Sequence, residues 1–263
     1  MTYFIDVQGT LIDDVNRKPI SGAIEFIDTL NKDNKDYIVI TNNTKQDSLV
    51  FLSYLQSLGF NINKDNYLDP LMVLDEVISI KKIAVYGHPS FIEVIEQKGY
   101  ELDYKTPEAI LIGIKPDFTN EEFAQMIDFI INGAKLIGMH ETSVYAKNNK
   151  RYPGVGAILK MLSYATGANY SVVGKPSIPF YKKAKELLKT KKDFTNITII
   201  SDDMKGDLLG AQYLGMKSVF VLSGKFKTKD EILPYLKKSD YPNMVMQNMA
   251  EVLKWYQKGE VWH

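Results

Sequence analysis

The sequence predicts an α/β protein with a mostly parallel sheet as its core and a second, smaller α/β domain inserted into it. Short apolar runs alternate with amphipathic segments along all 263 residues, a pattern typical of right-handed βαβ units. Polar residues follow several of these runs, where open parallel sheets bind ligands. One interval between such positions, residues 42–174, is far longer than a single helical connection requires.

The individual elements follow from residue type and periodicity. Continuous β-branched and aromatic runs indicate buried strands, most clearly YIVIT at 37–41 and ITIIS at 197–201. Apolar residues at helical spacing indicate helices, and Gly59 is a stop signal after one of them. Strands are predicted at 3–6, 37–41, 83–86, 109–113, 171–173, 197–201, 217–222 and 244–247, and helices at 22–30, 47–58, 90–98, 121–131 and 154–166. Helical sequence also follows each of the last two strands.

Motif spacing predicts the domain organisation. Between Asp6 and Thr41 there is room for one helix, whereas 133 residues separate Thr41 from Lys175. We therefore expect a Rossmann-like core made of residues 1–80 and 171–263. An inserted α/β cap of residues 81–170 would close over the ligand site and select the substrate.

The amino-acid composition narrows the classes of function that this protein can have. Hydrophobic residues make up 45% and charged residues 24% of the chain, as in ordinary globular proteins. The formal net charge is zero, which gives no electrostatic reason to expect nucleic acid or a membrane as a partner. The absence of cysteine excludes disulfides and a thiolate nucleophile. No targeting pattern or long apolar run is visible, so a cytoplasmic protein is expected.

Four predicted strand ends carry polar groups. They are Asp6, Thr41 with Asn42, Lys175 in Val-Val-Gly-Lys-Pro, and the acidic segment 201–207. Each alone is typical of a turn or a solvated loop. Because the carboxyl ends of parallel strands meet at one edge of a sheet, together they predict one crevice.

These side chains suit phosphoryl chemistry. The Asp6 carboxylate can attack phosphorus and form an aspartyl phosphate. Phosphate is anionic, so the attack requires positive charge, from a Mg²⁺ ion held by Asp6 and Asp202 and from Lys175. The Thr41 hydroxyl and the backbone N–H groups near Gly9 and Thr10 can hold phosphoryl oxygens. Asp207 can accept a hydrogen bond from Lys175 or from a water on the metal.

The motif order resembles that of the haloacid dehalogenase-like (HAD) phosphohydrolases. It runs Asp-x-x-Gly-Thr-Leu, strand-Thr-Asn, Gly-Lys-Pro and Asp-x-x-x-x-Asp. Further stretches at 19–23, 152–156, 165–167, 173–176 and 221–224 resemble the NagD-like branch, which includes 4-nitrophenyl, pyridoxal, phosphoglycolate and nucleotide phosphatases. The resemblance implies a type II (class IIA) cap, a Mg²⁺ cofactor, a small phosphorylated metabolite as substrate, and homodimers formed through the cap.

The resemblance also implies roles for individual residues. Asp6 is the nucleophile, and Thr41 and Lys175 bind phosphate and balance charge. The metal ligands are Asp6, Asp202 and the backbone carbonyl of Gln8. Asn42 and Asn43 lie beside the phosphate, Asp203 lies near the metal, and His140 in the cap is a candidate substrate contact.

Several residues depart from the family pattern. Gln8 stands where the family has the aspartate that protonates the leaving group, and it cannot exchange a proton. Ser201 replaces a glycine, Gly206 replaces a threonine, and His140-Glu141-Thr142 replaces Asn-Pro-Asp in the cap. The backbone carbonyl of Gln8 can still ligate Mg²⁺, whereas its side chain cannot supply general acid–base catalysis, which is worth roughly 10²–10⁴ in rate.

Three functions remain open at this stage. The first is a Mg²⁺-dependent phosphatase acting through Asp6, weakened by Gln8 on substrates with poor leaving groups. The second is a diverged protein that binds phosphorylated ligands with little turnover. The third is a phosphotransfer receiver, which the inserted domain and the chain length disfavour.

Overall fold

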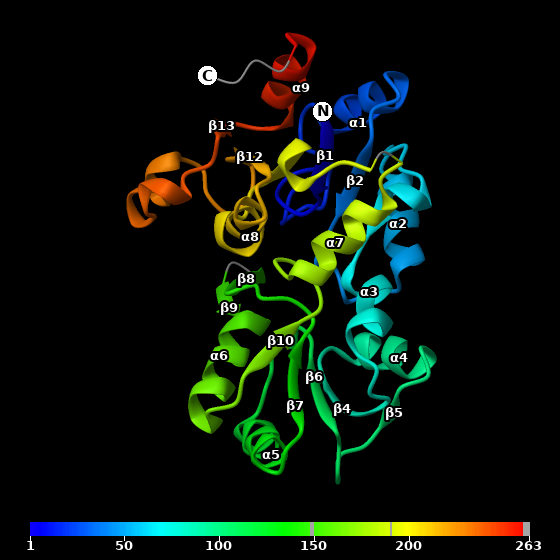
Figure 1. Cartoon of the computed structure of the whole chain (residues 1–263), viewed down its shortest axis with the longest axis vertical. Coiled ribbons are helices and arrows are strands. Elements are labelled where there is room, and N and C mark those ends of the chain that lie inside the picture. Colours follow the sequence, from blue (N-terminus) through cyan, green and yellow to red (C-terminus); the bar gives the residue numbers. More distant parts are fainter. Residues whose placement is uncertain (148–149, 190, 260–263) are drawn as a thin grey trace. The chain divides into compact units, whose positions relative to one another are not determined.

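The computed structural model in Figure 1 describes residues 1–147, 150–189 and 191–259. The chain forms two compact units. The core unit comprises Met1–Thr41, Leu49–Leu68 and Tyr181–His263, and the insert unit comprises Asn42–Ser48 and Asp69–Phe180. The cap boundaries at residues 81 and 170 stay a prediction, and residues 260–263 of the predicted core lie outside the described residues.

The core unit is built on a six-stranded sheet in which every described pairing is parallel. Its order is β13-β12-β11-β1-β2-β3, with β1 at Thr2–Asp6, β2 at Tyr37–Ile40, β3 at Tyr67–Leu68, β11 at Ile197–Ser201, β12 at Lys217–Val221 and β13 at Met244–Met246. Ile5 of β1 is in register with Ile200 of β11. The carboxyl ends of β1 and β11 therefore lie next to each other.

The remaining elements of the core unit are helices and short turns. The helices are α1 (Ala23–Lys32), α2 (Ser48–Ser57), α7 (Ile178–Leu187), α8 (Leu209–Tyr213) and α9 (Met249–Gln257), with a π-helical turn at Met204–Leu208 and short 3₁₀ turns at Lys64–Asn66, Phe194–Asn196, Lys229–Glu231, Leu233–Tyr235 and Lys238–Asp240. The Phe26 ring of α1 meets the rings of Tyr3 and Tyr256 edge to face, at centroid distances of 5.7 and 5.9 Å. This contact joins α1 and α9 to β1 in one apolar core.

The insert unit has its own parallel sheet, in the order β10-β7-β6-β4-β5. Its elements are α3 (Pro70–Val77), β4 (Lys82–Tyr86), α4 (Pro89–Gln97), β5 (Glu101–Leu102), β6 (Ala109–Ile112), α5 (Asn120–Ile131), β7 (Lys135–Gly138), the antiparallel pair β8 (Val144–Lys147) and β9 (Lys150–Pro153), α6 (Val155–Thr166) and β10 (Tyr170–Val172). Apolar residues of α5 and α6 cover β6 and β7 in a separate core. The unit therefore has the burial expected of an independent domain.

The structure confirms the predicted α/β class with parallel sheets. β3, α3, β5, β7, the β8–β9 pair, α7 and α8 were not predicted from the sequence. In α3 a signal was present, because Asp69 caps the helix by accepting from the Met72 N–H and Pro70 follows at its first position. No helix in the described part of the chain is long and apolar enough to cross a membrane.

Candidate active site

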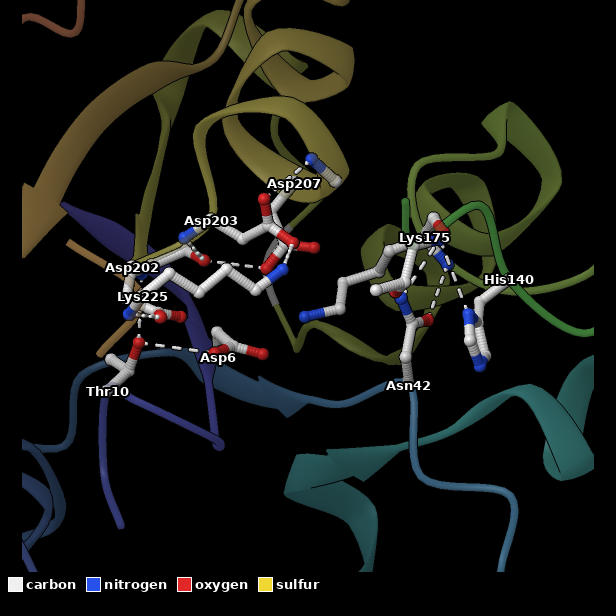
Figure 2. A network of polar contacts seen from close by, with 12 residues as sticks. Asp6, Thr10, Asn42, His140, Lys175, Asp202, Asp203, Asp207 and Lys225 are labelled. Atoms are coloured by element: carbon white, nitrogen blue, oxygen red, sulfur yellow. Dashed lines mark hydrogen bonds and ion pairs between the residues drawn. The ribbon is translucent and has the colours of Figure 1, made fainter. Parts of the chain in front are cut away.

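Two carboxylates from neighbouring strands meet at the carboxyl edge of the core sheet. Asp6 ends β1 and Asp202 follows β11, and their exposed fractions are only 5% and 2%. Thr10 connects them, because its hydroxyl donates to Asp6 Oδ2 (3.2 Å) and accepts from the Asp202 N–H (3.2 Å) (Figure 2). The predicted pairing of Asp6 with Asp202 is thus built into the fold by one threonine.

Two glycines make room for the Asp202 carboxylate. A Cβ atom at Gly9 would lie 2.3 Å from Asp202 Oδ2, and one at Gly224 would lie 1.9 Å from the same atom. Gly9 also has φ of +76°, which other residues adopt only at a cost. The Lys225 N–H donates to Asp202 Oδ2 at 2.7 Å, so the carboxylate is fixed on several sides.

The electrostatics around the two carboxylates favour a bound cation. Burial raises the pKa of Asp202 well above its usual range, and the charge of Asp6 raises it further, while Lys225 opposes the shift. Two acids that disfavour each other's charge in a buried site are the arrangement that a bound divalent cation relieves.

The donor set fits Mg²⁺ rather than a softer metal. Asp6, Asp202 and the Gln8 backbone carbonyl would supply oxygen ligands only. Within residues 1–147, 150–189 and 191–259, no group of three or more His, Cys, Asp or Glu side chains is arranged to hold a metal alone. A partial protein donor set suits Mg²⁺, which usually retains several waters.

Gln8 has a defined place beside this pair. Its side-chain Oε1 accepts a hydrogen bond from the Thr41 hydroxyl at 2.8 Å. The hydroxyl predicted to hold a phosphoryl oxygen therefore donates to Gln8 in this state, and an amide occupies the position of the family's proton donor. Thr41 itself is fully buried at the end of β2.

Two departures from the family pattern, Ser201 at the end of β11 and Gly206 after it, are both hydrogen-bonded to Asp203. The Ser201 hydroxyl donates to Asp207 Oδ2 at 2.6 Å and accepts from the Asp203 N–H at 3.0 Å. Asp203 Oδ1 accepts from the Gly206 N–H at 2.9 Å, and a Cβ at Gly206 would lie 2.3 Å from Asp203 Oδ2. Ser201 and Gly206 therefore hold Asp203 and Asp207 in place, which gives these substitutions a structural reason.

Lys225 is a charged member of the site that the sequence analysis did not identify. Its ammonium group forms a hydrogen-bonded ion pair with Asp203 Oδ2. Burial lowers the pKa of Lys225, but the carboxylates of Asp203 and Asp202 outweigh it and raise this pKa above its usual value. Its position in Ser-Gly-Lys after β12, at the same sheet edge, was the available signal.

The insert unit gathers the other predicted residues. Both amide atoms of the Asn42 side chain bond to the backbone of Lys175, which is 1% exposed. His140 is equally buried, and its Nδ1 accepts from the Thr142 N–H at 3.4 Å. Asn43 donates to the Gln46 carbonyl at 3.4 Å. The structure thus brings Asn42 and Lys175 together within this unit.

Fold and site define an α/β enzyme class that carries an aspartate pair at the carboxyl edge of a parallel sheet. A family model described as "haloacid dehalogenase-like hydrolase" matches residues 3–101, and a second HAD-hydrolase-like model matches residues 172–252. The chain belongs to the haloacid dehalogenase-like hydrolases, as the motif order predicted.

Sequence similarity to known proteins extends over nearly the whole chain. It is 29% identical over 254 residues to the bovine haloacid dehalogenase-like hydrolase domain-containing protein 2, covering 95% of this chain and 96% of that protein. It is 26% identical over 259 residues to the mouse phospholysine phosphohistidine inorganic pyrophosphate phosphatase, covering 97% and 94%.

Solved structures share the fold. The 4-nitrophenylphosphatase of Thermotoga maritima matches with a TM-score of 0.81 at 22% identity, over 96% of both chains. A glycerol phosphate phosphatase of Mycobacterium tuberculosis, solved in complex with magnesium, matches with a TM-score of 0.74 at 19% identity, over 95% of this chain and 75% of that chain.

Proposed function

We propose that this protein is a Mg²⁺-dependent phosphohydrolase of small phosphorylated compounds, with Asp6 as its nucleophile. The observation that carries the proposal is the Thr10 bridge, which holds the buried Asp6 and Asp202 carboxylates at one sheet edge. Named phosphatases among the similar proteins support the same reaction class.

The reaction proceeds in two displacements at phosphorus. An Asp6 carboxylate oxygen attacks, the Asp6–phosphorus bond forms, and the leaving group departs with the electrons of its own bond to phosphorus. Water then attacks the aspartyl phosphate, which restores the Asp6 carboxylate and releases inorganic phosphate. The proton of that water passes to phosphate or solvent, because Gln8 cannot accept it.

The other residues prepare these steps. The Thr10 hydroxyl, which also accepts from the Asp202 N–H, holds the Asp6 carboxylate in place, and Lys175 takes the charge-balancing role that the family resemblance implies. Asp6, Asp202 and the Gln8 carbonyl would hold Mg²⁺, which when bound neutralises phosphate charge. The magnesium complex of the mycobacterial glycerol phosphate phosphatase supports this cofactor.

Gln8 directs the choice of substrate. Without a proton donor, a leaving group must depart as a stable anion or already carry its proton. Aryl phosphates, acyl phosphates and phosphoanhydrides satisfy this condition, as does an N-phosphorylated amine that is protonated on nitrogen. The mouse relative is named for phospholysine, phosphohistidine and pyrophosphate, whose bonds to phosphorus are of these types.

Turnover on a graded series of leaving groups tests the proposal. With Mg²⁺ present, we expect hydrolysis of 4-nitrophenyl phosphate, acetyl phosphate and pyrophosphate, and a kcat/KM at least about tenfold lower for an alkyl phosphate such as glycerol phosphate. Asp6→Asn should abolish turnover of every substrate, because the amide is not a nucleophile.

The matched control is Asp28→Asn, which removes one exposed carboxylate from α1 and should leave turnover unchanged. No hydrolysis of any substrate by the native chain, together with phosphate binding, would favour a protein that only binds phosphorylated ligands. The amide of Gln8 is the observation that favours this second function, because it stands in place of the proton donor and accepts a hydrogen bond from Thr41 without being able to exchange a proton.

A further inference from the structure

We propose that Asn42 is a positioning residue for Lys175, which it fixes by clamping the lysine's backbone with its side-chain amide. The inference rests on the proposed function, in which Lys175 balances phosphate charge. The family resemblance implies that Asn42 lies beside the phosphate, whereas in this inference its side chain acts on phosphate through Lys175.

The clamp consists of two hydrogen bonds to the same residue. Asn42 Oδ1 accepts from the Lys175 N–H at 2.9 Å, and Asn42 Nδ2 donates to the Lys175 carbonyl at 3.3 Å (Figure 2). An amide that pairs with both polar groups of one residue fixes its orientation as well as its position, as strand pairing does. The two residues are 133 positions apart in sequence, so the clamp is a tertiary feature.

Neighbouring segments enclose the same stretch of backbone. The Glu141 N–H donates to the Lys175 carbonyl at 3.3 Å, and the Gly174 N–H donates to the Met139 carbonyl at 2.8 Å. A Cβ at Gly174 would lie 2.7 Å from Asn42 Oδ1 and 2.6 Å from Pro70 Cγ. Only glycine before Lys175 therefore admits the Asn42 amide at this distance.

Fixing this backbone matters because of what Lys175 must do. A lysine ammonium is a point charge on a stem of four carbons, with several rotatable bonds. In a buried charge site, displacement of about 1 Å can cost 10²-fold in rate. Lys175 is 1% exposed, so its stem is confined, and a fixed Cα position then determines where the ammonium lies.

A double-mutant cycle on phosphate affinity tests the inference. The dissociation constant of inorganic phosphate is measured by calorimetry with saturating Mg²⁺ for wild type, Asn42→Ala, Lys175→Met and the double variant. We expect each single substitution to weaken binding by about tenfold or more, and the double variant to bind no more weakly than Lys175→Met. We also expect kcat for 4-nitrophenyl phosphate to fall in Asn42→Ala.

The control is Asn31→Ala. The Asn31 amide also makes one donated and one accepted bond, to the Asn61 carbonyl at 2.7 Å and from the Tyr37 hydroxyl at 2.9 Å. Its removal should lower thermal stability while leaving phosphate affinity unchanged. If Asn42→Ala does not fold, the neutral Asn42→Ser takes its place in the cycle, with the same expectation.

The outcomes separate the two proposals. Additive losses would mean that Asn42 contacts phosphate directly or acts on the fold alone, and they would overturn the clamp. Full phosphate affinity in Asn42→Ala, with weak binding in Lys175→Met, would overturn the clamp and leave the proposed function intact. Unchanged phosphate affinity and turnover in Lys175→Met would contradict the role of Lys175 in balancing phosphate charge, and would overturn the clamp as well.

Discussion

Gln8 and Thr41 form one hydrogen-bonded pair in which neither side chain exchanges a proton near neutral pH. The Thr41 hydroxyl donates to Gln8 Oε1, and a carboxylate at residue 8 could accept the same hydrogen bond. The surroundings of residue 8 are thus compatible with a carboxylate. The site therefore lacks a proton donor only because of the side chain at residue 8.

Gln8→Asp should restore general acid–base catalysis. We expect a gain of about tenfold or more in kcat/KM on an alkyl phosphate, and a smaller gain on 4-nitrophenyl phosphate, whose leaving group needs no proton. Steady-state kinetics on both substrates measures the difference. Gln8→Asn, which shortens the side chain without adding a proton donor, is the control, and an equal change in both variants would contradict the explanation.

At the residue scale, a motif that coincided with a strand end made a site residue predictable from the sequence. Asp6, Asp202 and Thr41 were predicted in this way, because each comes at the end of a continuous apolar run, and their roles stay predictions. Lys225 was not predicted, because its place after β12 was the only signal and a single lysine after Ser-Gly looks the same as a lysine in a solvated turn. Its role depends on the Asp203 carboxylate, which tertiary structure alone brings to it.

At the scale of elements, a long buried run made some strands predictable, and the shortest strands gave no pattern to read. β1, β2 and β11 are fully buried runs of four or five residues, so their apolar patterns are continuous. β3 and β5 contain two residues each, too few to show any period. Such edge strands are defined by their pairing partners rather than by their own residues.

Helix α5 shows what a local signal contributes. Its capping box is complete, because the Thr119 hydroxyl accepts from the Glu122 N–H at 3.1 Å and the Glu122 carboxylate accepts from the Thr119 N–H at 2.9 Å. Glu122 also forms an ion pair with Lys115. Burial raises the pKa of Glu122, but the hydrogen bonds from Lys115 and Thr119 outweigh it and lower this pKa below its usual value.

The lowered pKa predicts a pH dependence of stability. Because the folded-state pKa lies below the unfolded one, the contribution of Glu122 is present above the unfolded pKa of about 4.5 and is lost as pH falls through the folded pKa. Glu122→Gln should therefore lose less stability than wild type between about pH 5 and pH 3. Urea unfolding across this range measures it, with a difference below about 1 kcal/mol because the pair is near the surface.

Glu121→Gln provides the control for this experiment. It removes the same charge from the first turn of α5 but leaves the capping box and the Lys115 pair in place. Its unfolding free energy should follow the wild-type pH profile. A profile for Glu122→Gln that also matches wild type would contradict a contribution from the ion pair.

At the scale of the whole molecule, the two buried site carboxylates lower the stability of the folded protein. Asp6 and Asp202 are both buried, and each raises the free energy of the other's charged form. The parallel sheet enforces this proximity, because β1 and β11 are adjacent and in register. Stability of the metal-free protein is therefore lower than the same sheet would have with neutral strand ends.

Mg²⁺ should consequently stabilise the whole protein. A ligand that binds only the folded state adds RT ln(1 + [L]/Kd) to the free energy of unfolding, or about 2.7 kcal/mol at a hundredfold excess over Kd. We expect the melting temperature to rise with Mg²⁺ concentration in calorimetry. Asp202→Asn should raise the melting temperature without metal and remove the response, whereas Asp28→Asn should respond as wild type does. A Mg²⁺ response that persists in Asp202→Asn would contradict the assignment of Asp202 as a ligand.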